Sequence, residues 1–331
     1  MKRLVDTYGR QIDYLRVSIT DRCNLRCLYC SPFDERRRYF QPEILSFEEI
    51  VRVVEAAVDV GISKIRITGG EPLVRRGVVD LCRMIAGFPG VQSLALTTNG
   101  VLLDEMAAPL AAAGVQRINI SLDTLHPLKF LKLTGYNGLA RVLNGIARAE
   151  AAGLNPVKLN TVVMRGVNDD ELVDLAQITL HKPYHVRFIE LMPSAGWPKG
   201  EYEKHFIPIE EIVKTIKTLG DLRLEHAVDS YGPARLCSLP GGVGSVGFIA
   251  PVTRHFCKAC NRLRLTADGK LRTCLFASEE IDIKRAIRSG ASNETLAEIL
   301  QKAVASKPRG HGLSDQNDGW AKGRLMRAIG G

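Results

Sequence analysis

A repeated unit in the first two thirds of the chain constrains its fold most strongly: a short β-branched run, a loop, then an amphipathic helical stretch. The predicted strands are residues 14–20, 64–68, 93–98, 117–122, 157–163 and 185–192. The predicted helices are residues 47–60, 78–86, 104–113, 139–152 and 169–179. Gly61, Gly114 and Gly153 stand where helix C-caps favour glycine. The alternation predicts an α/β fold with a parallel sheet and right-handed crossovers. An open doubly wound sheet and a curved partial barrel both satisfy this pattern.

The size and composition of the chain narrow its class. Its 331 residues exceed the usual size of one domain unless that domain is a barrel of about 250 residues. With 45% hydrophobic residues and no run of about 18 apolar residues, the sequence predicts a globular core and no membrane association. The net charge of +9 suits an anionic ligand or a nucleic acid. Eight cysteines without an export signal predict metal ligation in a reducing, cytoplasmic compartment.

Composition shifts after about residue 230, where glycine and proline punctuate short predicted strands. Residues 267–270 (Ala-Asp-Gly-Lys) predict a hairpin turn, and residues 281–305 predict a helix. Residues 306–331 are rich in glycine and charge, which predicts a flexible tail. We therefore divide the chain into residues 1–230, 231–305 and 306–331.

Cys23, Cys27 and Cys30 form a C-x3-C-x2-C triplet that is one ligand short of a closed metal site. Three thiolates can hold three corners of a [4Fe–4S] cube and leave the fourth iron open. A disulfide is disfavoured because the chain has no secretory signal. A structural zinc site is disfavoured because the nearby sequence supplies no fourth cysteine or histidine. The triplet therefore predicts a reactive iron–sulfur cluster.

Polar or glycine-rich segments follow successive predicted strands, and in parallel α/β folds these ends meet at one rim. The segments are the cysteine triplet, residues 69–72, residues 97–100, residues 121–123 and Met192. Gly69 and Gly70 allow the backbone to approach a ligand closely, and Glu71 could orient this turn rather than act as a base. We expect these segments to form one active site.

Cys257, Cys260 and Cys274 form a second triplet, C-x2-C-x13-C. On spacing alone it fits either a cluster or a structural zinc site completed by Cys237. The helical pattern around Cys82 predicts an ordinary buried thiol. The seven histidines show no H-x-x-x-H spacing, so none is assigned a catalytic role.

The first triplet, with an aromatic residue before its last cysteine and a later Gly-Gly-Glu-Pro turn, resembles the radical S-adenosylmethionine superfamily. The resemblance implies an incomplete (β/α)6 TIM-like barrel. It also implies that S-adenosylmethionine chelates the open iron and is split by the reduced cluster, giving a 5′-deoxyadenosyl radical.

A narrower resemblance, covering residues 14–331, is to the GTP 3′,8-cyclase family of molybdenum cofactor biosynthesis. It rests on residues 16–23, 188–193, 247–257, 261–266 and 274–276 and on the terminal Gly-Gly pair. Ser31 stands where the family pattern has methionine. The resemblance implies that the second triplet holds a second [4Fe–4S] cluster, in a C-terminal extension, whose open iron faces the guanine of GTP. Cys237 is then a bystander.

The resemblance also implies residue roles. S-adenosylmethionine contacts are Tyr29, Gly70, Ser121 and Met192. GTP contacts are Arg16, Arg66, Thr97, Lys158, Arg262, Leu263 and Arg264. Arg187 is added because, like Arg66, it lies inside an apolar strand where an unpaired charge is costly and because guanidinium forks suit phosphates. Gly330 and Gly331, by the same resemblance, reach the active site from the tail.

The implied activity converts GTP to 3′,8-cyclo-7,8-dihydro-GTP by hydrogen abstraction at C3′ and attack on C8, the first step of molybdenum cofactor biosynthesis. The implied partners are a flavodoxin- or ferredoxin-type electron donor and a downstream cyclic pyranopterin monophosphate synthase, and a homodimer is compatible. The alternative is a radical enzyme that matures a peptide or modifies tRNA. Only 6% of the chain is aromatic and no RNA-binding module is evident, so no nucleic-acid partner is expected.

Overall fold

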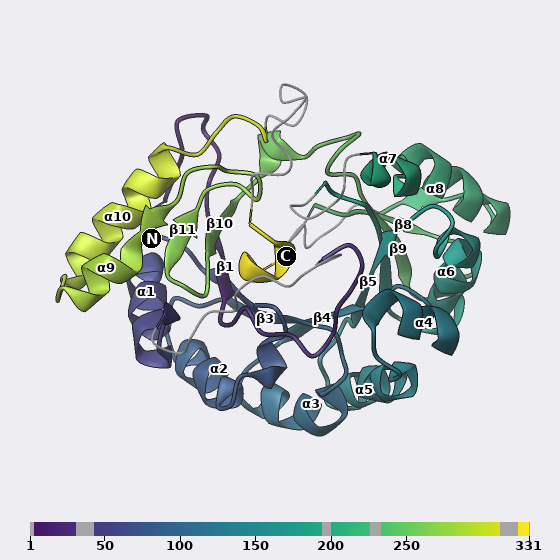
Figure 1. Cartoon of the computed structure of the whole chain (residues 1–331), viewed down its shortest axis with the longest axis horizontal. Helices are drawn as coiled ribbons and strands as arrows, with labels where there is room; N and C mark the ends of the chain where they lie inside the picture. The colour runs from purple at the N-terminus through teal and green to yellow at the C-terminus, as the bar shows by residue number, and fades with distance from the viewer. Residues whose placement is uncertain (1–2, 31–42, 194–199, 226–232, 312–323, 331) are drawn as a thin grey trace.

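The computed structural model describes residues 3–30, 43–193, 200–225, 233–311 and 324–330. In these ranges one twelve-stranded sheet has the order β12-β11-β10-β1-β2-β3-β4-β5-β6-β9-β8-β7. It curves around a central space, with the helices outside (Figure 1). The six predicted strands are confirmed as β1 (Tyr14–Ser18), β2 (Lys64–Thr68), β3 (Ser93–Thr98), β4 (Arg117–Ser121), β5 (Lys158–Val163) and β6 (His185–Glu190).

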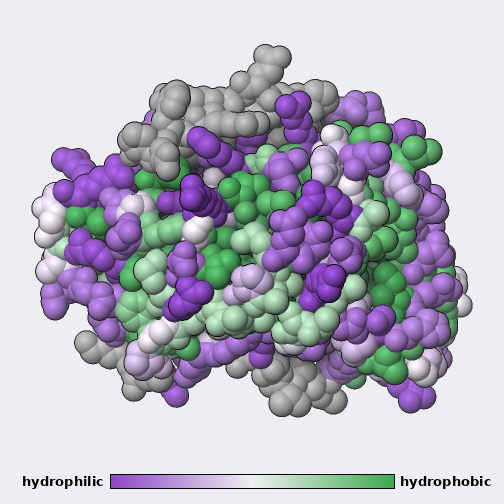
Figure 2. Space-filling model, turned by 90° about the horizontal axis from the view of Figure 1, so that it is seen from below, coloured by the Kyte–Doolittle hydropathy of each residue, from purple (hydrophilic) through white to green (hydrophobic). Residues whose placement is uncertain are grey.

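The outer helices explain why the strands are apolar on one face. Residues such as Leu15, Ile65 and Leu96 are fully buried beneath these helices, whereas Arg16 and Arg66 alternate with them and face inward. The helices are α1 (Phe47–Asp59), α2 (Val78–Ala86), α3 (Leu103–Ala112), α4 (Pro127–Thr134), α5 (Leu139–Ala151), α6 (Leu172–His181), α7 (Glu201–His205) and α8 (Ile209–Ile216). Seen from below the view of Figure 1, the surface mixes hydrophilic and hydrophobic residues (Figure 2).

Local signals begin α1 and end α1, α3 and α5 where the sequence predicts, whereas α6 begins three residues after the predicted start at 169, and α4, α7 and α8 are not among the predicted helices. Ser46 caps α1 through a capping box with Glu49. The predicted C-terminal glycines, Gly61, Gly114 and Gly153, have φ angles of +108°, +90° and +79°, a region that favours glycine. No helix in the described ranges is long and apolar enough to cross a membrane.

Strands from the C-terminal region extend the six-stranded core at both edges. β9 (Ser245–Ile249) pairs parallel with β6, and β10 (Arg262–Leu265) pairs parallel with β1. The remaining strands are β7 (Arg223–Leu224), β8 (Arg235–Ser238), β11 (Lys270–Arg272) and β12 (Ile281–Asp282). β10 and β11 form the predicted hairpin around Gly269, whose φ is +77°. The fold is therefore an incomplete barrel with a C-terminal extension, as predicted.

The predicted single helix over residues 281–305 is wrong. The segment instead forms β12, then α9 (Ile283–Arg288), then α10 (Asn293–Ala305). Gly290, with φ +81°, follows the end of α9, and the Ser292 side chain accepts a hydrogen bond from Thr295 N to begin α10. Together these residues interrupt the helical pattern.

The C-terminal segment enters the barrel. The short 3₁₀ helix η7 (Met326–Ala328) lies in the central space, where Figure 1 places the end of the chain. Arg324 anchors this segment through paired contacts of its guanidinium to Asp268, at 2.7 and 2.9 Å, and one to Glu280 at 2.5 Å. Gly331 and residues 312–323 lie outside the described residues.

Candidate active site

Two adjoining cavities occupy the inside of the barrel. The larger one, which we call the inner cavity, has a volume of about 260 Å³ and receives residues from β1 to β6 and from the C-terminal extension. The smaller one, the cysteine-loop cavity, lies at the C-terminal ends of β2, β3 and β4. Four residues line both cavities: Tyr29, Thr97, Ser121 and Met326. The cavities therefore form one continuous site, at the strand ends that the sequence indicates.

The first cysteine triplet lines the cysteine-loop cavity, opposite Gly69 and Gly70. Nitrogen donors approach the Cys23 sulfur from Leu25 N at 3.4 Å and Asn99 Nδ2 at 3.8 Å. Such donors stabilise a thiolate that ligates iron, so the triplet fits a cluster. Ser31 lies outside the described residues.

Gly70 also packs closely against the protein's own backbone. Its N–H donates to Thr20 O at 2.7 Å, and a Cβ on it would lie 2.4 Å from Arg22 O. The close approach is thus to the backbone that leads into the first triplet. Residues 69–71 pack directly on this backbone and so fix the position of the cysteine loop.

Glu71 has the orienting role that the sequence allowed. Its carboxylate accepts from Leu73 N at 3.0 Å, Thr98 Oγ1 at 2.7 Å and Asn99 N at 2.6 Å. Burial raises the pKa of Glu71 to about 7, against the lowering effect of these bonds. The carboxylate therefore ties the Gly-Gly turn to the end of β3.

A tyrosine–aspartate pair joins the cysteine loop to β4 and β5; both residues are predicted at the active site, but the sequence does not predict their bond. The Tyr29 hydroxyl donates to Asp123 Oδ2 at 2.8 Å, and Val162 N donates to Asp123 Oδ1 at 2.8 Å. Burial raises the pKa of Asp123 to about 6. Its place directly after β4 was the one available signal. The pair holds the third cysteine of the loop against the sheet.

Three arginines lie side by side on neighbouring strands of the inner cavity. In the register of the sheet, Arg16 of β1 is level with Arg264 of β10 on one side and Arg66 of β2 on the other. Burial, followed by the charge of Arg264, lowers the pKa of Arg16 well below its ordinary value. Burial and the charge of Arg66 lower the pKa of Arg187, across the cavity, to about 9.

The inner cavity is therefore strongly basic. Among the described residues that line it, the cations are Arg16, Arg66, Arg187, Arg262, Arg264 and Lys307. Glu190 is the one carboxylate in this lining, and it already accepts from Ile209 N, Val252 N and Thr253 N. The buried Nε atoms of Arg66 and Arg187 make no hydrogen bond within the described protein. A polyanion would satisfy this charge and these donors.

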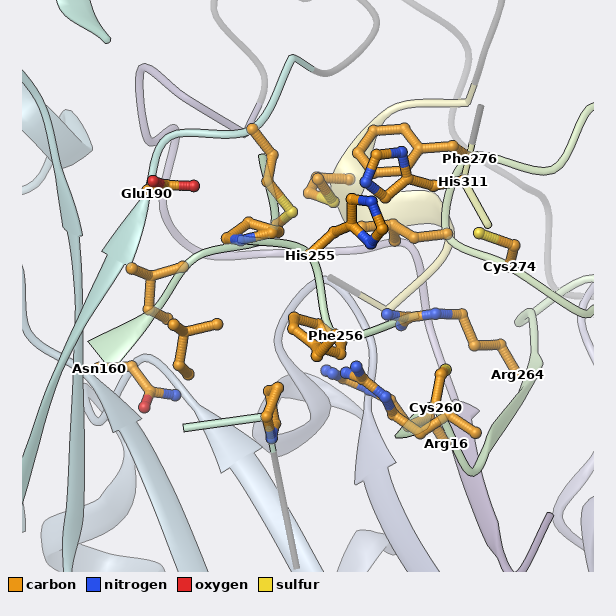
Figure 3. A pocket seen from close by; sticks show the side chains of 18 of the residues that line it. Arg16, Asn160, Glu190, His255, Phe256, Cys260, Arg264, Cys274, Phe276 and His311 are labelled. Carbon is orange, nitrogen blue, oxygen red and sulfur yellow. The ribbon is translucent and has the colours of Figure 1, made fainter. Parts of the chain in front are cut away.

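The second cysteine triplet lines the same cavity on the side of the arginines (Figure 3). Cys257 lies in the 3₁₀ turn η5 (Cys257–Ala259), Cys260 follows it, and Cys274 follows β11. Burial acts to raise the pKa of Cys260, but the charges of Arg262 and Lys307 outweigh it and lower the pKa to about 7. A thiolate is the form that binds metal, so this triplet also fits a cluster.

Most of the predicted contact residues line these cavities. The inner cavity includes Tyr29, Ser121, Met192, Arg16, Arg66, Thr97, Arg187, Arg262 and Arg264. Gly70 lines the cysteine-loop cavity, and Gly330 O accepts from Arg264 Nη1 at 3.1 Å. The buried Lys158 and Leu263 are not among the lining residues, and the half-buried Cys237 lies on β8, away from β10 in the order of the sheet.

Two histidines that the sequence analysis left without a role meet at the second triplet. His255 and His311 pack edge to face with ring centroids 5.0 Å apart, and Phe276 packs on His311 (Figure 3). Ligand atoms of His255, Cys257 and His311 lie within 4.8 Å of one another. No short spacing relates the two histidines, so only the tertiary structure reveals the group.

Family comparisons divide the chain into two matched segments. Residues 17–178 match the family described as Radical SAM superfamily, and residues 184–313 match the family described as Molybdenum Cofactor Synthesis C. The second match begins before residue 231 and extends past residue 305. Our boundaries at 230 and 305 stay predictions.

Curated relatives match the chain over nearly its whole length. A protein named GTP 3′,8-cyclase from Pelotomaculum thermopropionicum is 48% identical over 98% of this chain and 99% of its own length. Proteins of the same name from Heliobacterium modesticaldum and Desulforamulus reducens are 49% and 47% identical, covering 99% of this chain and all of their own length.

Solved structures share the fold at low sequence identity. The crystal structure of Streptococcus suis SuiB bound to S-adenosylmethionine is 14% identical, with a TM-score of 0.64 over 98% of this chain and 74% of that one. Methylornithine synthase (PylB) is 18% identical, with a TM-score of 0.50 over 62% of this chain and 61% of that one.

Proposed function

Because the chain belongs to the GTP 3′,8-cyclase family of radical S-adenosylmethionine proteins, we propose that GTP binds in the inner cavity and that the bond between C3′ and C8 forms in this cavity. One observation carries the assignment of substrate to site: the in-register row Arg264, Arg16 and Arg66, which faces Arg187 across a cavity between two cysteine triplets. The product is 3′,8-cyclo-7,8-dihydro-GTP, the first intermediate of molybdenum cofactor biosynthesis.

The arginine row suits a triphosphate. Like charges on neighbouring strands repel, so the row costs stability until an anion neutralises it. Guanidinium forks bind phosphate oxygens in pairs, and three forks in register offer a linear series of donors. Thr97, whose buried hydroxyl oxygen makes no hydrogen bond within the described protein, adds a further polar contact to the same cavity.

We assign the first [4Fe–4S] cluster to Cys23, Cys27 and Cys30 and the S-adenosylmethionine contacts to Tyr29, Gly70, Ser121 and Met192. When the cluster is reduced and S-adenosylmethionine is bound, the two together supply the 5′-deoxyadenosyl radical that abstracts hydrogen from the GTP ribose. The chain positions it: Glu71 and Gly70 fix the loop, and the Tyr29–Asp123 bond holds its far end. Tyr29, Thr97 and Ser121 lie where the two cavities meet, so both reactants can share one site.

We assign a second [4Fe–4S] cluster to Cys257, Cys260 and Cys274, with GTP held by Arg262, Leu263 and Arg264 beside it and by Lys158. Anaerobic reconstitution distinguishes the possibilities, because about eight irons per chain indicate two clusters and about four indicate one. A count near four, with zinc present, would favour a structural zinc site.

We assign Gly330 and Gly331 to the active site as a tail that enters the barrel. A Cβ on Gly330 would lie 2.6 Å from Thr68 Cγ2 and 3.1 Å from Ser18 Cβ, and its φ is +69°. Gly330→Ala should displace the tail and lower cyclisation. Gly153→Ala is the matched control, because its φ of +79° is similar and a Cβ there meets nothing within 4 Å.

The test of the function adds dithionite, S-adenosylmethionine and GTP to the reconstituted protein. We expect 5′-deoxyadenosine to form in a GTP-dependent way together with the cyclised nucleotide. Release of 5′-deoxyadenosine that depends on a peptide or tRNA, and not on GTP, would instead support the alternative radical enzyme. We further propose a cytoplasmic enzyme that takes electrons from a flavodoxin- or ferredoxin-type donor and passes its product to a cyclic pyranopterin monophosphate synthase.

A further inference from the structure

A buried lysine joins the two chain segments that carry Cys260 and Cys274. Lys307 follows α10 and is only 3% exposed. Its Nζ donates to Arg262 O at 2.9 Å and to Thr273 O. Arg262 is two residues after Cys260, and Thr273 directly precedes Cys274. One ammonium group thus fixes the spacing between two of the three thiols of the second triplet.

The charge of Lys307 is placed where a cluster would use it. A buried ammonium group is costly unless anions and acceptors surround it. Two carbonyl oxygens supply the acceptors, and the thiolates of Cys260 and Cys274 supply favourable charge. Arg10 and Arg262 oppose it, so the ammonium group is best stabilised when the thiolates carry their full negative charge.

The residues after Lys307 lie against Cys257, the remaining cysteine of the second triplet. Arg10, which is ion-paired with Asp6 at 2.5 Å, donates to Cys257 O at 2.8 Å, to Pro308 O at 2.7 Å and to Arg309 O at 3.2 Å. The backbone N–H of His311 donates to the Cys257 thiol. Residues 307–311 therefore connect all three cysteines, and Lys307 is the contact that spans Cys260 and Cys274.

We propose that Lys307 is a positioning residue for the second cluster: its ammonium group closes the ligand set by tying the Cys260 and Cys274 segments together. The proposal rests on the second cluster assigned above. Lys307 also lines the inner cavity, so a direct contact with the phosphates of GTP is the competing explanation. Only the positioning role predicts that loss of Lys307 changes the iron content before GTP is present.

The experiment measures iron and acid-labile sulfide in anaerobically reconstituted wild-type, Lys307→Met, Lys307→Gln and Lys307→Arg chains. Lys302→Met is the matched control, because Lys302 lies five residues earlier on an exposed position of α10. We expect about eight irons in wild type and control, about four in the Met and Gln variants, and partial recovery in Arg. The first cluster serves as an internal check of folding, since its four irons remain only in a folded barrel.

A chain without the first cysteine triplet isolates the effect of Lys307 on the second cluster. With Cys23→Ala, Cys27→Ala and Cys30→Ala combined, the chain should hold about four irons, and adding Lys307→Met should remove them and the reduced-cluster electron paramagnetic resonance signal. About four irons in wild type would mean that the second cluster itself is absent. Eight irons in Lys307→Met, with weaker GTP binding, would overturn the proposal in favour of phosphate contact. Loss of both clusters would overturn it in favour of a general role in folding.

Discussion

The substitution Arg16→Met should make the ligand-free protein more stable and its complex with GTP weaker. Arg16 stands between Arg264 and Arg66 in the sheet register. Guanidinium groups about 6 Å apart repel by ~0.7 kcal/mol in water and by ~2.8 kcal/mol at an effective dielectric constant of 20. Removing the central charge relieves two such pairs. Taking the lower value because the cavity admits solvent, we expect the free energy of unfolding to rise by about 1.4 kcal/mol.

The effect on binding has the opposite sign. A charge-assisted hydrogen bond contributes about 1.5–3 kcal/mol, so loss of one fork should weaken GTP binding by ~3 kcal/mol, on the order of 100-fold. Arg16→Lys keeps the charge and loses the fork, so it should recover part of the affinity and none of the stability. Arg83→Met is the surface control, since the Arg83 side chain is 61% exposed on α2.

Two assays separate these terms. Denaturant unfolding of the ligand-free chain measures stability, and anaerobic calorimetric titration of the reconstituted chain measures GTP affinity. A less stable Arg16→Met chain would show that the arginines support one another through other contacts. Unchanged GTP affinity would show that the row does not hold the triphosphate.

Three further predictions concern the two cysteine triplets and the C-terminal segment. Burial raises the pKa of Asp123 from 3.8 to about 6, so the folded chain binds more protons than the unfolded chain between these values. The free energy of unfolding of the cluster-free chain should therefore fall as pH rises from about 4 to 6, and Asp123→Asn should make this fall shallower, leaving the part that Glu71 contributes through its raised pKa of about 7. In the cluster-free chain, iodoacetamide should alkylate Cys260 faster than Cys257 at pH 7.5, by mass spectrometry, because the pKa of Cys260 is about 7 and that of Cys257 is raised. Equal rates would contradict this electrostatic account. Arg324→Ala removes the paired contact with Asp268, so limited proteolysis should release the C-terminal segment faster than from wild type, with unchanged cleavage elsewhere.

The strand–helix alternation and the hairpin around Gly269 could be predicted because they depend on residues a few positions apart. The helix predicted over residues 281–305 failed where Gly290 and Ser292 stop one helix and begin the next. Both residues are visible in the sequence, but the helical spacing of hydrophobic residues continues across them and so predicted a single helix. The packing of Gly70 against Arg22 could not be predicted, because Arg22 belongs to a loop that only the fold brings beside it.

The residues of the functional site also fall into those that the sequence predicts and those that it does not. The two cysteine triplets could be found from spacing, and buried arginines such as Arg66 from the cost of a charge in an apolar strand. His311 and Lys307 could not be assigned, because their partners lie far away in the chain; Asp123 could be placed at the strand-end rim, but its bond to Tyr29 could not be predicted. Nothing within a local window distinguishes a lysine that bridges two cysteine segments from one in a charged tail.

The sequence by itself determined the repeat of strands and helices, the spacing of the two cysteine triplets and the excess of basic residues, because each is a property of neighbouring positions or of composition. Only the tertiary structure decided which of these residues meet. β10 pairs with β1 in a register that sets Arg264 beside Arg16, and residues 307–311 lie against the second triplet. Pairing between distant segments is chosen by the burial of whole sheet faces, and this cooperative choice leaves no local pattern.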